Sequence, residues 1–119
     1  MSHKILVVDD DEGIVDAITL ILEESGYTVD STLQAEEIYR KIQVFKPDSI
    51  LLDVLMSGQD GREICKKLKG NGITKHIPVI MISAHPTAKA GAIKSGADDF
   101  LEKPFEVDNL LHMLSKHTS

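Results

Sequence analysis

The sequence has 119 residues, 42% of them hydrophobic, which predicts one compact domain with a single core over residues 1–119. Its formal net charge of −6 argues against direct nucleic-acid binding, because affinity for DNA comes largely from Lys and Arg side chains that neutralise phosphates. The apolar runs are far shorter than the roughly 20 residues that span a bilayer, and the first residues lack a secretory pattern. We therefore expect no membrane contact and a cytoplasmic location.

Short segments rich in β-formers alternate five times with longer helical patterns along the chain. The predicted strands cover residues 4–9, 27–31, 49–53, 79–83 and 99–102. Continuous apolar runs, such as Ile5 to Val8 and Ile50 to Leu52, indicate strands that are buried on both faces. Such strands are typical of a parallel sheet that helices cover on both sides.

Apolar residues at helical spacing predict the helices between these strands. The expected core positions are Ile14, Ile18, Ile21 and Leu22 in the first helix, Ile64 and Leu68 in the third with Cys65 as a small packed residue, and Val107, Leu110, Leu111 and Leu114 in the last. Glycines that can adopt left-handed caps follow three of the helices, at Gly26, at Gly70 and Gly72, and at Gly96.

The expected fold class is α/β, a doubly wound parallel sheet of five strands with helices on both faces, or (βα)5. In such sheets, ligands bind beyond the carboxyl ends of the strands. The polar residues at these ends are Asp9, Asp10 and Asp11 after the first strand, Asp53 after the third, Ser83 after the fourth and Lys103 after the fifth. We therefore expect the functional site at this edge of the sheet.

Carboxylates gathered at one edge need a compensating cation. Two unit charges about 4 Å apart interact by roughly 4 kcal/mol at an effective dielectric constant near 20. Carboxylate oxygens are hard ligands, so Asp9, Asp10 and Asp53 together predict a Mg²⁺ site. Asp11 and Glu12 are instead interpreted as the acidic start of the first helix, where carboxylates cap free backbone N–H groups.

Asp53 has two interpretations, a plain strand end or a nucleophile beside a metal. The second is favoured, because a carboxylate placed beside two others is otherwise an uncompensated electrostatic cost. Carboxylates form aspartyl phosphates when a metal and a cation neutralise the phosphoryl oxygens. Lys103 is the candidate cation, and Ser83 is the candidate hydroxyl donor. The chain must turn after Lys103 at Pro104, where we expect a cis peptide bond.

The motifs at the strand ends resemble the signature of receiver domains of response regulators in two-component signalling, namely Val7-Val8-Asp9-Asp10, Leu51-Leu52-Asp53, Ile82-Ser83-Ala84 and Lys103-Pro104-Phe105. The resemblance covers the whole chain and implies a flavodoxin-like sheet with strand order 2-1-3-4-5, as in the single-domain chemotaxis regulator. It implies that Asp53 is the phosphoacceptor. It also implies that Asp9, Asp10, Asp53 and the backbone carbonyl of Leu55 hold Mg²⁺.

The resemblance assigns roles to three further residues. Ser83 becomes the hydroxyl that moves toward the phosphoryl group, and Lys103 becomes the charge partner of that group. Phe100 becomes an aromatic switch that turns inward on activation, although a static core position explains the same residue equally well.

The sequence departs from the family pattern at two places near the site. Ser57 stands where family members commonly have proline, which predicts a looser loop after Asp53. The pair His85-Pro86 is uncommon after Ser83-Ala84. Since Leu55 and His85 flank the site in the family geometry, we expect both to influence the lifetime of the phosphoryl group.

The implied function is that of a phosphorelay receiver that accepts a phosphoryl group from a histidine kinase or a histidine phosphotransfer protein. Such a domain catalyses only its own phosphorylation and dephosphorylation, and it switches a surface that binds a downstream protein target. Gly13 and Ile14 are expected near the docking face for the phosphoryl donor. The last helix lacks the Arg-rich face that forms salt-bridged dimers in receivers of transcription factors, and this favours a monomer or a transient dimer. The residues that it carries instead are Asn109, His112, Met113 and Lys116.

Three other functions remain as alternatives. The run from Asp9 to Gly13 nearly matches the nucleophile motif of haloacid-dehalogenase-type phosphohydrolases, but Gly13 breaks it. A nucleotide or flavin module would need a phosphate-cradling loop, and the loop after the first strand is acidic instead. A degenerate receiver that serves only for docking would not need the complete set of site residues.

Overall fold

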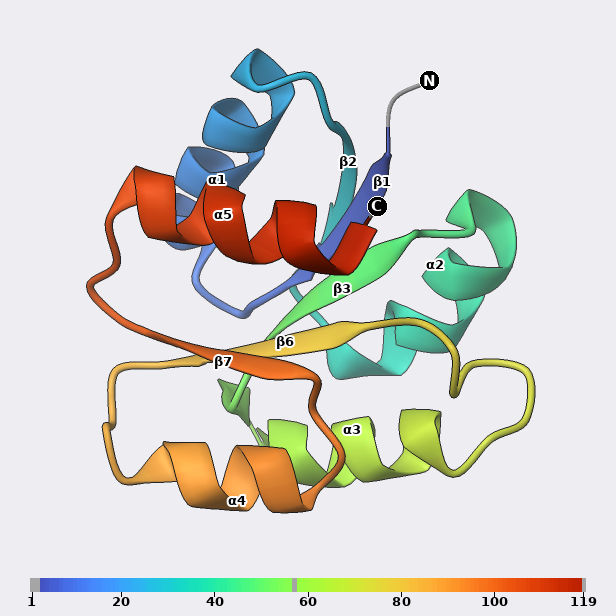
Figure 1. The fold of residues 1–119 in the computed structure, drawn as a ribbon. Helices are drawn as coiled ribbons and strands as arrows, with labels where there is room; N and C mark the ends of the chain where they lie inside the picture. Colours follow the sequence, from blue (N-terminus) through green and yellow to red (C-terminus); the bar gives the residue numbers. More distant parts are fainter. Residues whose placement is uncertain (1–2, 57, 119) are drawn as a thin grey trace.

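Five parallel strands form the central sheet of the computed structural model, which describes residues 3–56 and 58–118 (Figure 1). Its members are β1 (Lys4–Val8), β2 (Thr28–Thr32), β3 (Ser49–Asp53), β6 (Val79–Ser83) and β7 (Asp99–Glu102). They lie in the order β2-β1-β3-β6-β7 and pair in parallel throughout. This is the predicted order 2-1-3-4-5 of the five sheet strands, so the doubly wound fold class is confirmed.

The strand bounds agree closely with the sequence prediction. β3, β6 and β7 match it at both ends, β1 stops one residue earlier at Val8, and β2 is shifted by one residue. The central strands β3 and β6 are buried at every position, because helices cover both of their faces.

Helices on the two faces of the sheet form two covering layers (Figure 1). On one side lie α1 (Glu12–Glu24) and α5 (Val107–Thr118). On the other side lie α2 (Ile38–Phe45), preceded by the short 3₁₀ helix η1 (Ala35–Glu37), and then α3 (Gly61–Lys69) and α4 (Ala88–Lys94). Among the described residues, no helix is both long and apolar enough to cross a membrane.

The sheet divides the hydrophobic core into two layers, where the composition had suggested one. Ile5 and Val7 of β1 pack with the residues of α1 and α5. Leu6 and Val8 point to the opposite side and pack with the residues of α2 and α3. Alternation of side chains along each strand therefore supplies both layers from the same apolar run.

Most of the expected helix core positions are buried, with some corrections. Val107 is 44% exposed, because it is the first residue of α5 and precedes the buried stripe at Leu110 and Leu114. Val15 is only 4% exposed and belongs to the core of α1, although the prediction did not include it. Half-buried residues pack at the margin of that layer, namely Ile14, Ile21 and Leu111.

The glycine caps are confirmed at two of the predicted ends. Gly26 has a φ of 96° and Gly96 has a φ of 102°, so both adopt the left-handed conformation after their helices. Gly70 ends α3 with a φ of −86°, a right-handed conformation, and Gly72 also lacks a positive φ. The cap at α3 was therefore predicted at the right place but with the wrong backbone geometry.

A small antiparallel hairpin follows β3 and was not predicted. It consists of β4 (Leu55–Met56) and β5 (Gln59–Asp60), with Leu55 opposite Asp60. Two-residue strands are too short to leave a periodic pattern in a sequence. Ser57, which was expected to loosen this loop, lies outside the described residues.

Candidate functional site

Three carboxylates meet beyond the carboxyl ends of β1 and β3. One oxygen from each of Asp9, Asp10 and Asp53 lies within 4.8 Å of the others. Asp9 is 3% exposed and Asp53 is 8% exposed, while Asp10 is more open to solvent. The predicted acidic cluster therefore exists, and two of its members are withdrawn from water.

Hydrogen bonds hold the Asp9 carboxylate in place from two directions. Its Oδ1 accepts the backbone N–H of Asp11 at 2.9 Å, and its Oδ2 lies 3.0 Å from Nζ of Lys103. Asp11 itself is the N-cap of α1, and its Oδ1 accepts the backbone N–H of Ile14 at 3.2 Å. The separate interpretation of Asp11 as a cap is therefore confirmed, and only Asp9 and Asp10 join the cluster.

Lys103 reaches the cluster from the end of β7. Its Nζ lies 3.0 Å from Oδ2 of Asp9 and 3.6 Å from Oδ1 of Asp53. The backbone N–H of Lys103 donates to the carbonyl of Ser83 at 2.8 Å, and the peptide bond from Lys103 to Pro104 is cis, as expected. Lys103 and Asp9 are 94 residues apart in the chain, and the sheet brings the ends of their strands to the same edge.

The electrostatic balance of the cluster disfavours ionisation of Asp53. Burial raises the pKa of Asp53 from its usual 3.8 to about 6, and the charges of Asp9 and Asp10 act in the same direction. The charge of Lys103 and a hydrogen bond from the backbone N–H of Leu55 act to lower this pKa but do not cancel the rise. The cluster therefore carries more negative charge than one lysine neutralises.

The residues present fit a divalent cation. Three carboxylates with converging oxygens form a hard donor set, and a Mg²⁺ ion is commonly held by one or two carboxylates together with waters and phosphate oxygens. A cation at this place would also relieve the repulsion that raises the pKa of Asp53. Leu55 contributes its backbone N–H to Asp53, whereas the role of its carbonyl as a metal ligand stays a prediction.

The hydroxyl candidate lies one strand away from the carboxylate candidate. Ser83 is 3% exposed at the end of β6, the strand that pairs with β3 and places Ile82 opposite Asp53. The Oγ of Ser83 accepts the backbone N–H of His85 at 3.0 Å. The side chains of His85 and Leu55 are both exposed, and their expected influence on the phosphoryl group stays a prediction.

Phe100 packs inward from β7. It is 8% exposed, lies opposite Met81 of β6 and belongs to the core layer under α3 and α4. This position agrees with the interpretation as a core residue. A second position, which a switch requires, stays a prediction.

The sequence did not reveal the close contact between the start of α3 and the backbone of Asp53 and Val54. The N–H of Gly61 donates to the carbonyl of Val54 at 2.6 Å, and a Cβ at Gly61 would collide with the carbonyl oxygen of Asp53. Asp60 caps α3 and binds Arg62 through both carboxylate oxygens. The pair Asp60-Gly61 is a common turn signal, and it is the feature of the sequence that could have indicated this turn.

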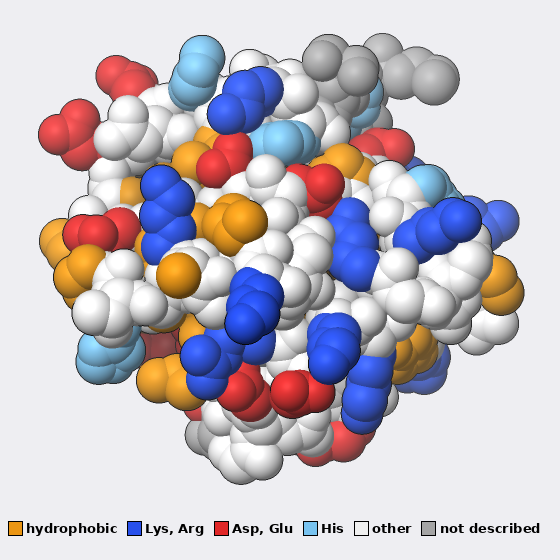
Figure 2. All heavy atoms as spheres, turned by 60° about the horizontal axis from the view of Figure 1, so that its bottom comes forward, with side chains coloured by type: hydrophobic (Ala, Val, Ile, Leu, Met, Phe, Trp, Pro, Cys, Tyr) orange, Lys and Arg blue, Asp and Glu red, His pale blue; other side chains and the backbone are white. Residues whose placement is uncertain are grey.

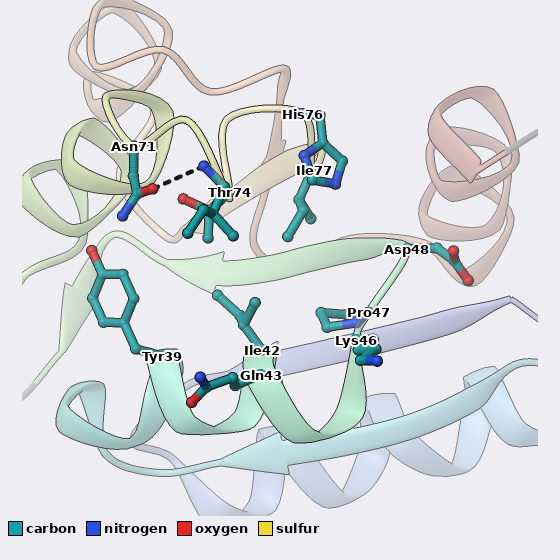
Figure 3. A pocket seen from close by; sticks show the side chains of 11 residues that line it. Tyr39, Ile42, Gln43, Lys46, Pro47, Asp48, Asn71, Thr74, His76 and Ile77 are labelled. Carbon is teal, nitrogen blue, oxygen red and sulfur yellow. Dashed lines mark hydrogen bonds between the residues drawn. The ribbon is translucent and has the colours of Figure 1, made fainter.

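A cavity outside the site lies at the opposite edge of the sheet. It has a volume of about 600 Å³ and separates α2 from the loop that precedes β6 (Figure 3). Tyr39 and Ile42 of α2 face Thr74 and Ile77 of that loop across the space. No residue of the acidic cluster lines this cavity, so the site described above does not depend on it.

A second cavity of about 390 Å³ adjoins the site. Ile14, Ile18 and Ile21 of α1 form one wall, and the segment Lys103 to Phe105 forms the other. This apolar hollow lies where Gly13 and Ile14 were expected to border a docking face. Lys103 belongs both to its wall and to the acidic cluster.

Fold and site together define a class of protein, the flavodoxin-like α/β domains that carry a cluster of carboxylates and a lysine beyond the carboxyl ends of the sheet. Residues 5–115 match the response regulator receiver domain family. The chain belongs to this family, and it is therefore a signalling domain of two-component systems.

Similar proteins and solved structures agree with this assignment. The chain is 41% identical over 107 residues to the alkaline phosphatase synthesis transcriptional regulatory protein PhoP of Bacillus subtilis, covering 88% of this chain and 44% of PhoP. A putative response regulator of Chloroflexus aurantiacus has a TM-score of 0.93 at 32% identity and covers 99% of this chain and 98% of its own. The chemotaxis protein CheY4 of Vibrio cholerae has a TM-score of 0.89 at 29% identity, with 98% and 99% covered.

The chain spans about half the length of the curated relatives that it matches. The activity and partners of those whole proteins are therefore not transferred with the family.

Proposed function

We propose that Asp53 accepts a phosphoryl group in a Mg²⁺-dependent reaction and that this modification switches a protein-interaction surface. One observation carries the proposal: Asp53 shares a cluster of converging carboxylate oxygens with Asp9 and Asp10, and Nζ of Lys103 lies 3.6 Å from its Oδ1. Phosphoryl transfer to aspartate requires a nucleophilic carboxylate, carboxylates that can hold a cation, and a neighbouring lysine.

In this reaction, an oxygen of the Asp53 carboxylate forms a bond to phosphorus while the bond from phosphorus to the donor's imidazole nitrogen breaks. The nitrogen keeps the bonding electron pair and takes up a proton. Asp9 and Asp10 would hold Mg²⁺ with Asp53, and the bound ion would neutralise charge on the phosphoryl oxygens. Lys103 supplies a second positive charge, and it is already positioned by its contact with Asp9.

The switch belongs to the same proposal. The hydroxyl of Ser83 donates a hydrogen bond to a phosphoryl oxygen, for which its Oγ exchanges the present contact with the N–H of His85. Phe100 then follows in the direction that this movement opens, as a shift between two packings. Leu55 and His85 are exposed at the rim, where their side chains control the approach of water and so the lifetime of the aspartyl phosphate.

The proposed phosphoryl donor is a histidine kinase or a histidine phosphotransfer protein. The apolar hollow between α1 and the segment after β7 supports this, because it opens beside Lys103 and is bordered by Ile14. In this proposal residues 1–119 act as one cytoplasmic receiver domain, a monomer or transient dimer that signals to a downstream protein and does not bind nucleic acid itself. PhoP is a transcriptional regulator by name, so a longer parent protein would place any such output outside these residues.

Incubation with acetyl phosphate tests the proposal without a cognate kinase. Wild type with Mg²⁺ is expected to gain one phosphoryl group by intact mass, whereas Asp53→Asn and wild type with EDTA gain none. Asp16→Asn is the matched control, because Asp16 is an exposed carboxylate on α1 and should not affect labelling. Absence of labelling in wild type under all conditions would favour a receiver that serves only for docking.

A further inference from the structure

Positive and negative charges are segregated along this chain. Residues 61–96 hold seven of the thirteen Lys and Arg residues but only one of the nineteen Asp and Glu residues, Glu63. This segment therefore has a formal net charge of +6, and the rest of the chain has −12. Net charge alone conceals a strongly cationic part inside an acidic protein.

The fold gathers these cations on one surface. The segment contains α3 and α4, which lie side by side under the sheet, and Lys and Arg side chains crowd the face that these helices present (Figure 2). Arg62, Lys66 and Lys69 follow one another at helical spacing along α3. A Cβ at Gly91 would meet the side chain of Arg62, and one at Gly96 would meet that of Lys69, so this row borders α4 and its end.

Two of the cations are neutralised within the protein, and five are not. Arg62 pairs with Asp60 at 2.8 Å, and Lys69 pairs with Asp98 at 2.6 Å. The five others are exposed, and across residues 3–56 and 58–118 no carboxylate lies within ion-pair distance of them. We call this surface the basic face; its members are Lys66, Lys67, Lys75, Lys89 and Lys94.

Aliphatic side chains accompany the lysines. Ile93 is 46% exposed beside Lys94, and Ile73 is 79% exposed two residues before Lys75. A partner that complements this surface therefore carries carboxylates together with a few apolar side chains.

We propose that the basic face binds a short acidic, amphipathic segment of a partner protein. The dimensions of the domain, 31 × 30 × 25 Å, favour a short segment over an extended polyanion. Charges beyond about 8 Å are largely screened at physiological ionic strength, so a short peptide interacts mainly with the lysines. A long DNA duplex or a charged bilayer would extend over the acidic remainder of the surface and be repelled by it.

The test measures binding of a fluorescein-labelled peptide with Glu and Leu at amphipathic helical spacing, by fluorescence anisotropy. The face variant is Lys66→Glu with Lys94→Glu. The control variant is Arg40→Glu with Lys116→Glu, which replaces two exposed cations on α2 and α5 and has the same net charge as the face variant. Circular dichroism checks that both variants are folded.

The face variant is expected to bind the peptide at least about tenfold more weakly than wild type, and the control less than about threefold more weakly. Binding by wild type should also weaken between about 50 mM and about 300 mM NaCl, as charge pairing requires. Neither Mg²⁺ nor a phosphoryl donor is present, so this result is independent of the function proposed for Asp53.

Several outcomes would overturn the proposal. Equal losses in the two variants would mean that binding follows net charge and not the basic face. Tighter binding of a DNA duplex or of vesicles with anionic lipid than of the peptide would assign the surface to another class of partner. Salt-sensitive self-association in sedimentation velocity, abolished only in the face variant, would identify a second copy of this chain as the occupant.

Discussion

The Asp53 carboxyl group holds its proton more tightly in the folded protein than in the unfolded protein. Its pKa is about 6 in the folded state and 3.8 when exposed to water, because burial and the charges of Asp9 and Asp10 disfavour its ionised form. A group with a raised pKa favours the folded state below pH 4, and this contribution is lost as the pH rises through about 6. At neutral pH, without a bound cation, ionised Asp53 therefore destabilises the fold.

Replacement of Asp53 by Asn should accordingly stabilise the metal-free protein. We expect Asp53→Asn to raise the free energy of unfolding by up to roughly 3 kcal/mol at pH 7.5, with the difference from wild type shrinking toward pH 4. Urea denaturation of both proteins in EDTA across this pH range measures it. A difference that grows as the pH falls would contradict the electrostatic explanation.

Lys103 is the counterpart of this carboxylate. Its removal leaves the buried Asp9 and Asp53 without their cation, so Lys103→Met should destabilise the metal-free protein at pH 7.5 by about 2 kcal/mol. Urea denaturation measures the change, with Lys89→Met as a control because Lys89 is exposed on α4. If the two variants lose equal stability, the contacts of Lys103 with the cluster contribute nothing in particular.

The start of α3 is the element that supports the site. Gly61 is buried, and its Cα approaches the backbone of Asp53 and Val54 so closely that no side chain fits. Asp60 caps the helix and pairs with Leu55 in the hairpin, so the same turn joins α3 to the residue that donates to Asp53. The position of α3 thereby determines the position of the candidate nucleophile.

Gly61→Ala tests this dependence. The added methyl group must displace the backbone at Asp53, which should cost about 2 kcal/mol of stability and slow labelling by acetyl phosphate at least about tenfold. Gly72→Ala is the control, because a Cβ there has open space and the backbone has no positive φ. If Gly61→Ala is destabilised but is labelled at the normal rate, the contact of Gly61 with Asp53 supports stability and does not determine the geometry of the site.

At the scale of the whole molecule, one sheet serves two core layers. Leu22 of α1 lies in one layer and Leu68 of α3 in the other, and each is at most 1% exposed. Because the strands contribute alternate residues to both layers, neither layer persists without the sheet. The domain is therefore expected to unfold as one cooperative unit.

Leu22→Ala and Leu68→Ala should each lower the free energy of unfolding by about 3 kcal/mol, since each deletes a fully buried side chain from its layer. Urea transitions followed by circular dichroism and by tyrosine fluorescence should coincide in both variants. Two separate transitions in either variant would show that the layers unfold independently.

Much of this architecture was predictable from the order of residues along the chain. Strands buried on both faces need unbroken apolar runs, so β3 and β6 are visible as Ser49–Asp53 and Val79–Ser83 with correct bounds. Parallel strands also end at one edge of the sheet, and this rule alone brings Asp9, Asp53 and Lys103 to a common site. Fold class, strand ends and the composition of the site are therefore properties of the sequence.

The tertiary structure decided what depends on distances between segments. It determines that Asp53 is buried enough for its pKa to rise, that Gly61 must lack a side chain, and that lysines of α3 and α4 share one face. The short hairpin of β4 and β5 and the exposure of Val107 are further features that only the tertiary structure revealed. Local patterns report which side of an element is apolar, whereas burial, electrostatic balance and surface charge arise only when separate elements pack together.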